Sequence, residues 1–200
     1  MNQLIHDYNQ LKYEINQRLN DFKNIKDDDL FYELCFCILT PQSSGFRADE
    51  CIQELKKLDF KNKNINPKPI LKKKIRFHNN KSNYLLLAKK SFLGISSKLN
   101  EIKNLNELRE YLVENVKGLG LKESSHFLRN IGYENLAILD RHILKNLKEY
   151  KVINKIPKTL TKKEYYRIEK RFKSFSNRIG ISLDALDLLF WSKETGKIFK

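Results

Sequence analysis

The feature that most restricts the fold of this chain is the helical spacing of its apolar residues. Between residues 4 and 22 they recur every three or four positions, which places them on one face of a helix. No segment alternates apolar and polar residues at strand spacing for long. The first stripe consists of Leu4, Tyr8, Leu11, Ile15, Leu19 and Phe22. The sequence therefore predicts an all-α fold.

Residues typical of helix ends divide the rest of the chain into further helices. Acidic residues at 27–29 favour the first turn of a helix that ends before Pro41. A capping box at 161–164 begins a late helix. The expected amino-terminal caps are Ser43 or Ser44, Asn66, Asn80, Asn104 or Asn106, and Thr161, and the glycines expected to end helices are Gly180 and Gly196.

The charge of the chain is strongly positive. Its 39 Lys and Arg residues outnumber 24 Asp and Glu residues, for a net charge of +15. Such a field attracts polyanions, including nucleic acid. A solvated, lysine-rich surface explains the same composition without any nucleic acid, so the charge leaves both interpretations open. A length of 200 residues suits one domain or two small lobes.

The three cysteines, Cys35, Cys37 and Cys51, are an odd number among apolar neighbours. We expect buried free thiols in a reducing cytoplasm rather than disulfides. Too few ligands lie at suitable spacing for a metal site, so no metal is expected. The amino-terminal residues lack an apolar secretory core and no 18-residue apolar run occurs, which predicts a cytoplasmic protein without membrane contact.

Two glycines separated by one residue lie in the segment from Val116 to Leu121, between two helical stretches. Gly118 and Gly120 allow a sharp turn and a close approach of the backbone to a ligand. Free amides of this turn, at the start of the next helix, form an anion site that suits a DNA phosphate, with Lys117 beside it. A purely structural two-helix hairpin has the same pattern, so the glycine pair alone decides nothing.

The wider segment narrows the choice. The pattern hydrophobic-x-Gly-x-Gly-x-Lys runs from Val116 to Lys122, a helix follows, and Leu-Asp-Arg-His places Asp140 eighteen positions after Lys122. This pattern resembles the helix-hairpin-helix DNA glycosylase superfamily. The segments GLGLKESSHFLRNIG and LDRHIL, with the closing TGKIFK, are similar to the archaeal-type, second class of 8-oxoguanine DNA glycosylase/AP lyase. The likeness covers essentially the whole chain, and it implies that Lys122 and Asp140 are catalytic.

One family feature is missing. Relatives of the endonuclease III type hold an iron–sulfur cluster on four cysteines near the carboxyl end, whereas no cysteine follows Cys51 here. We therefore expect no such cluster and no other cofactor.

The implied reaction suits these residue types. The damaged nucleotide must leave the duplex, and a carboxylate at Asp140 would stabilise the positive charge that develops on its sugar. A neutral amine at Lys122, favoured by the helix amino terminus and by Lys117, would attack the sugar and form a Schiff base, which permits β-elimination. Two other interpretations stay open: Lys122 as an exposed phosphate contact, and Asp140 as the cap of RHILKNL.

Further residues are candidates for contacts with DNA. Gln42, in a polar segment, could bind the orphaned base, or belong to an ordinary loop. Phe77 and Trp191 could stack on 8-oxoguanine, or belong to the core. The Lys200 carboxylate could bind the guanine edge, or be an ordinary terminus. The remaining candidates for phosphate contacts are Arg129, Arg141 and His142, of which His142 could equally pack within its helix.

We expect two helical lobes with a basic cleft between them. One lobe would span 29–132 and include the hairpin, and the other would combine 1–28 with 133–200, so that Lys122 and Asp140 meet at the junction. The expected partner is double-stranded DNA containing oxidised guanine or abasic sites, bound by a monomer. The alternatives are a glycosylase of the same superfamily for another damaged base and a DNA-binding module without enzyme activity.

Overall fold

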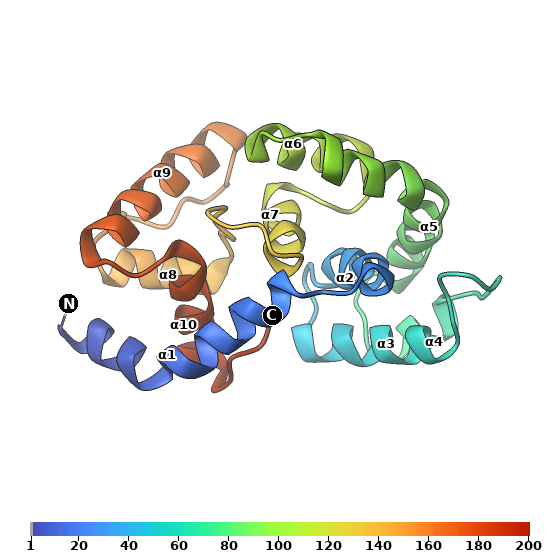
Figure 1. The fold of residues 1–200 in the computed structure, drawn as a ribbon, viewed down its shortest axis with the longest axis horizontal. Coiled ribbons are helices and arrows are strands. Elements are labelled where there is room, and N and C mark those ends of the chain that lie inside the picture. The colour runs from blue at the N-terminus through green and yellow to red at the C-terminus, as the bar shows by residue number, and fades with distance from the viewer. Residues whose placement is uncertain (1) are drawn as a thin grey trace. The chain divides into compact units, whose positions relative to one another are not determined.

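The computed structural model describes residues 2–200, and within them every regular element is a helix. This confirms the all-α expectation (Figure 1). The helices are α1 (Asn2–Lys23), α2 (Asp27–Leu39), α3 (Gly45–Lys57), α4 (Lys68–Lys72), α5 (His78–Glu101), α6 (Leu105–Asn115), α7 (Leu121–Asn130), α8 (Arg141–Glu149), α9 (Lys162–Ile179) and α10 (Leu183–Thr195).

The chain divides into two compact units. Unit 1 combines the residues up to Asn24 with Leu128–Lys200, and unit 2 is the continuous segment Ile25–Phe127. The expected lobes had their boundaries four and five residues later, after residues 28 and 132. The later boundary of the units falls inside α7, so the helix after the glycine turn contributes residues to both units.

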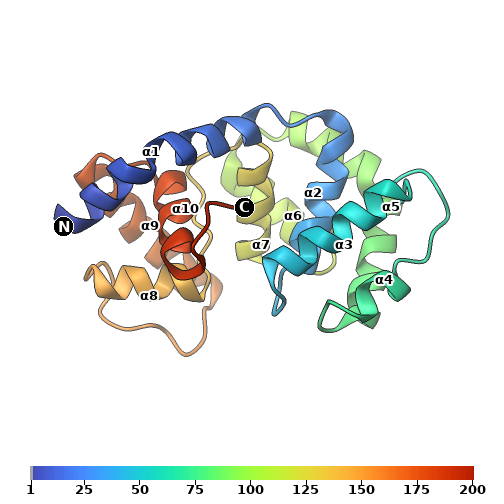
Figure 2. The same ribbon diagram turned by 90° about the horizontal axis from the view of Figure 1, so that it is seen from below.

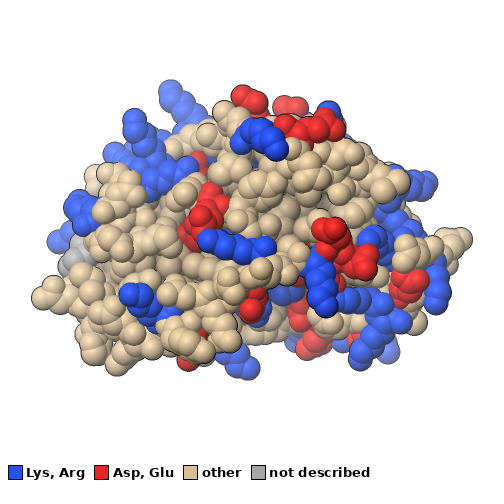
Figure 3. Space-filling model, viewed as in Figure 1, with Lys and Arg blue, Asp and Glu red and all other residues tan. Residues whose placement is uncertain are grey.

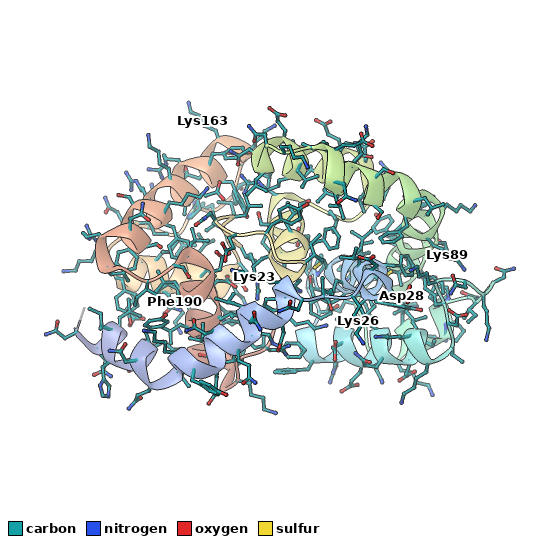
Figure 4. All side chains as sticks on the ribbon, in the orientation of Figure 1. Lys23, Lys26, Asp28, Lys89, Lys163 and Phe190 are labelled. Atoms are coloured by element: carbon teal, nitrogen blue, oxygen red, sulfur yellow. The ribbon has the colours of Figure 1, made fainter. Side chains whose placement is uncertain are left out.

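In unit 1, α10 is the central helix. It contacts α1, α8 and α9, and Figures 1 and 2 both show α1 running against it. Phe190 of α10, labelled in Figure 4, stacks on Tyr150 and Phe172 with ring centroids 5.6 and 6.1 Å away. α10 is apolar around most of its surface because helices cover it on several sides.

In unit 2, α2 packs against α3 and α5, and α4 contacts α3 and α5. Phe31 of α2 anchors this core, with the rings of Phe92 and Phe60 at 5.2 and 5.9 Å. All three cysteines are buried and none of them forms a disulfide, as expected from the sequence. Burial raises the pKa of the Cys51 thiol to about 11, so this group is unreactive at neutral pH.

The helix ends agree with most of the expected caps. The Asn104 side chain accepts from two amides of α6, and the Thr161 hydroxyl accepts from Glu164 N. Gly180 and Gly196 end their helices with φ of 69° and 78°. The Asn80 prediction was wrong, because α5 begins two residues earlier, after a residue in the left-handed conformation.

The charged surface is spread over both units. Figure 3 shows basic side chains over α9 of unit 1 and acidic ones over α6 of unit 2. The net charge therefore does not by itself locate a binding site. The basic residues of α9 are Lys162, Lys163, Arg167, Lys170, Arg171, Lys173 and Arg178, and the acidic residues of α6 are Glu107, Glu110 and Glu114.

Residues 2–200 contain neither a helix suited to cross a membrane nor a cluster of side chains suited to hold a metal ion. None of the helices in that range is long and apolar enough to cross a membrane. In the same range, no group of three or more His, Cys, Asp or Glu side chains is arranged to hold a metal ion.

Candidate functional site

The turn between α6 and α7 depends on a glycine. Gly118 has a φ of 95°, in a region that side-chain-bearing residues rarely adopt. A Cβ at this position would also lie 2.8 Å from the Tyr84 ring of α5. Backbone conformation and close packing therefore both require glycine here, as the Gly-x-Gly pattern predicts.

A buried arginine holds the two helices of this hairpin together. Arg109 of α6 is fully buried, and its guanidinium donates to Ser125 Oγ on α7 and to Asn106 Oδ1, both at 3.1 Å. Ser125 Oγ in turn donates to the Leu121 carbonyl at 2.9 Å. The fixed fork of the guanidinium suits this role, because its donors contact both helices at once.

The amides of the turn are less open than the sequence indicated. Gly120 N donates to the carboxylate of Glu123 at 3.2 Å, and Leu119 N donates to the Val116 carbonyl at 3.2 Å. Glu123 thus acts as the acidic member of a capping arrangement at the start of α7. The expectation of free amides is corrected at these two positions, while Lys117 beside them is exposed.

Lys122 occupies the first turn of α7. Its side chain is one-quarter exposed, and Nζ lies 2.9 Å from Glu123 Oε1. The same carboxylate therefore contacts both Gly120 and Lys122, so the residue after the lysine links the turn to the amine.

Asp140 in unit 1 is the amino-terminal cap of α8. Its backbone is extended, and Oδ1 accepts from His142 N and Ile143 N, both at 2.8 Å. The capping interpretation is confirmed. The two hydrogen bonds to Oδ1 fix the orientation of the carboxylate. Asp140 is also partly exposed.

The residues that follow the cap form a charged cluster on α8 and α10. Arg141 Nε donates to His142 Nε2 at 3.2 Å, and His142 Nδ1 lies 3.8 Å from Glu194 Oε2. Lys145 also pairs with Glu194, and its hydrogen bond and charge lower the pKa of that carboxyl. Arg141 is exposed, whereas His142 is partly covered by this cluster.

Arg129 requires a correction. It was expected to contact DNA phosphate, but only 3 % of it is exposed. Its guanidinium pairs with Asp187 of α10 at 3.2 Å and lies over the Phe22 ring, 4.7 Å from the centroid. A side chain enclosed in this way has no surface to offer a phosphate, so Arg129 supports the core of unit 1 instead.

The aromatic candidates differ from each other. Trp191 is partly exposed and its ring stacks on Phe199 at 5.9 Å, a partner that sequence reasoning missed. Phe77 is 53 % exposed and has a φ of 57°. Lys200 is partly exposed, beyond the end of α10.

Gln42 is exposed and also has a positive φ, 53°. Sequence reasoning missed Lys81, a buried lysine whose Nζ donates to the carbonyls of Leu39 and Pro41 next to Gln42. A signal did exist: Lys81 continues the apolar stripe of α5, four residues before Leu85.

The sequence matches a known protein family. Residues 15–181 match the model of a family described as 8-oxoguanine DNA glycosylase. An 8-oxoguanine DNA glycosylase/AP lyase of Fusobacterium nucleatum is 43% identical and covers 96% of this chain and 94% of its own length. The protein with the same description from Methanocaldococcus jannaschii is 38% identical, over 96% of this chain and 94% of its own.

Solved structures agree. The crystal structure of the Methanocaldococcus jannaschii 8-oxoguanine glycosylase/lyase in complex with 15mer DNA containing 8-oxoguanine matches with a TM-score of 0.89 at 35% identity, covering 99% of this chain and 100% of that one. The 8-oxoguanine DNA glycosylase of Thermotoga maritima matches with a TM-score of 0.89 at 31% identity, over 100% and 97% of the two chains.

Proposed function

Because this chain belongs to the 8-oxoguanine DNA glycosylase family, we propose that it excises 8-oxoguanine from DNA and then cleaves the abasic strand. It is a bifunctional DNA glycosylase and AP lyase of base-excision repair. The observation that carries this proposal is the position of Lys122, in the first turn of the helix that follows the glycine turn, in a chain of this family.

Lys122 is the nucleophile. Its neutral Nζ attacks C1′ of the flipped nucleotide, the C1′–N9 bond breaks, and the base leaves with the bonding electrons and takes up a proton. Nζ must first lose its proton, which turns its ion pair with Glu123 into a neutral pair before the attack. The Glu123 carboxylate is well placed to receive that proton, at 2.9 Å.

Asp140 stabilises the positive charge that develops on the sugar as the glycosidic bond breaks. The two amides bonded to Oδ1 hold the carboxylate in one orientation without adding a positive side chain next to it. Its charge therefore remains available to a bound sugar.

The lyase step follows from the amine nucleophile. After the sugar ring opens, the nitrogen and C1′ form a Schiff base, which acidifies the C2′ proton. Loss of that proton moves its electron pair into a C2′–C3′ double bond and expels the 3′ phosphate, and water later releases Lys122.

The remaining candidates bind the duplex. Lys117 and the hairpin turn at Gly118 and Gly120 contact the phosphate backbone, as do Arg141 and His142. Gln42 contacts the unpaired partner base, and Phe77, Trp191 and Lys200 contact the lesion. The protein acts as an intracellular monomer on double-stranded DNA with oxidised guanine or abasic sites, without a cofactor.

Borohydride reduction tests the nucleophile. The wild-type protein should form a covalent adduct with an abasic duplex, and Lys122→Gln should form none. Lys90→Gln, which removes an exposed lysine of α5, is the matched control and should trap as the wild type does. A wild-type protein that forms no adduct would remove the lyase assignment.

Substrate comparison tests the lesion. Of duplexes with 8-oxoguanine, thymine glycol or uracil, the one with 8-oxoguanine should be cleaved far faster than the other two. Preference for thymine glycol would instead support the alternative glycosylase for an oxidised pyrimidine.

A further inference from the structure

The loop after α2 is a tight turn with a strained residue at its tip. Ser43 N donates to the Thr40 carbonyl at 3.0 Å, and Pro41 precedes Gln42, which has a φ of 53°. Proline at the second position and a positive φ at the third are the features of a type II turn, whose preferred third residue is glycine. The left-handed backbone of Gln42 costs conformational free energy, which contacts in the rest of the fold must offset. Strained residues of this kind are typical of functional positions.

A second strained residue lies just before α5. Phe77 has a φ of 57°, and 53 % of it is exposed. The Arg76 guanidinium lies over its ring, 5.4 Å from the centroid. An aromatic residue gains nothing locally from a left-handed backbone. The conformation of this turn therefore also depends on contacts made elsewhere in unit 2.

One hydroxyl connects the two strained turns. Ser43 Oγ accepts from the backbone N–H of Arg76 at 3.2 Å, and also from Lys81 Nζ at 3.1 Å. Ser43 is the neighbour of Gln42, and Arg76 is the neighbour of Phe77. Gln42 and Phe77 are thus each one residue away from the same hydrogen-bonded centre.

Lys81 makes that centre rigid. Only 4 % of the residue is exposed, and Nζ donates to the carbonyls of Leu39 at 2.7 Å and Pro41 at 2.6 Å as well as to Ser43 Oγ. An ammonium has three donors, and all three have acceptors here. Its own backbone N–H donates to the Phe77 carbonyl at 3.0 Å, so Lys81 contacts both turns.

We propose that Lys81 is a positioning residue whose buried ammonium, together with Ser43, locks the Gln42 turn and the Phe77 turn into one rigid element for engaging duplex DNA. The proposal rests on the proposed function, since it assigns these turns to the DNA-binding surface. In this proposal Gln42 and Phe77 contact the DNA, whereas Lys81 and Ser43 hold them in place without contacting it.

The electrostatics of Lys81 are consistent with this role. Its pKa is lowered to about 8, mainly by burial and also by the charges of Lys122 and Arg76, while the charge of Glu123 raises it. At pH 7, which is below this value, the ammonium with its three donors is the main form. A neutral amine has only two donors, so deprotonation would leave one of the three acceptors without its bond.

Hydrogen exchange tests the locking directly. In Lys81→Met, amides of residues 42–43 and 76–77 should exchange about tenfold faster, and together, because both turns lose the same anchor. Lys90→Met removes an equal charge from the exposed face of α5 and should change neither segment. Exchange within twofold of the wild type in a folded Lys81→Met protein would overturn the proposal. If Lys81→Met does not fold, Ser43→Ala is judged by the same criterion.

Adduct formation tests the consequence for DNA. With an abasic site opposite cytosine, Lys81→Met should trap about tenfold more slowly than the wild type, while trapping on an abasic single strand stays within twofold. An equal loss on both substrates would place Lys81 in the chemistry, and no loss on the duplex would remove its effect on DNA; either result refutes the positioning role. A wild-type protein that traps neither substrate would refute the proposed function instead, and hydrogen exchange would still decide the role of Lys81.

Discussion

Replacing Asp140 by Asn and by Ala separates its capping role from its proposed catalytic role. Asp140 Oδ1 accepts two backbone hydrogen bonds at 2.8 Å, and an Asn side-chain oxygen can accept the same two. Ala loses both bonds and the charge as well, which should lower the free energy of unfolding by about 2 kcal/mol and the melting temperature by roughly 4–8 °C. Asn loses only the favourable charge at the helix amino terminus, about 0.3–1 kcal/mol.

Excision should respond differently from stability. Both variants lack the negative charge, so the single-turnover rate of 8-oxoguanine release should fall about 100-fold in each. Thr161→Ala removes a comparable cap from α9 and should lose about 1 kcal/mol of stability while excising at the wild-type rate. Excision by Asp140→Asn within threefold of the wild type would refute the electrostatic role, and an Asn variant as unstable as the Ala variant would refute the capping argument.

Three further outcomes are expected. Gly118→Ala should lower stability by more than about 1 kcal/mol and weaken DNA binding in gel shifts, because its Cβ would meet a ring at 2.8 Å, whereas Gly94→Ala, with nothing within 4 Å, should raise stability by about 0.5–1 kcal/mol. Arg129→Met should cost about 3–5 kcal/mol in denaturant unfolding because it leaves Asp187 buried without its ion pair, and the double variant with Asp187→Leu should recover much of the loss. Burial lowers the pKa of Lys81 from 10.5 to about 8, so between these pH values the unfolded chain binds more protons than the folded protein. The free energy of unfolding should therefore rise with pH across this window, by up to about 3 kcal/mol relative to Lys81→Met. An identical pH dependence of stability in the two proteins would refute this prediction.

The helices were predictable because their signals are local. Asn104 and Thr161 cap as expected, and glycine at Gly180 supplies the left-handed conformation that ends α9. The start of α5 was not predictable in the same way. It follows Phe77, which has a positive φ, and the N–H of the neighbouring Arg76 donates to Ser43, 33 residues earlier. The sequence around Phe77 does not encode this tertiary contact.

The site was predictable where a motif of fixed spacing carries it. The hairpin glycines and the cap at Asp140 have the local structure that the pattern implies. The contacts around these residues were not predictable, because the partner of a charged side chain depends on the tertiary structure. Arg129 has the composition of a phosphate contact, yet Asp187, fifty-eight residues later, encloses it.

Buried cations are the common element of what the motifs missed. Lys81, Arg109 and Arg129 are each at most 4 % exposed, in a chain with ample surface for positive charge. Apolar side chains of similar volume would fill these positions without the cost of removing a charge from water. Apolar side chains could not, however, form hydrogen bonds to polar groups of separate segments. Lys81 and Arg109 each form several such bonds, and Arg129 forms an ion pair with Asp187. We therefore infer that these three cations mainly fix the geometry of the loops and helices that they join, and contribute less to the stability of the fold.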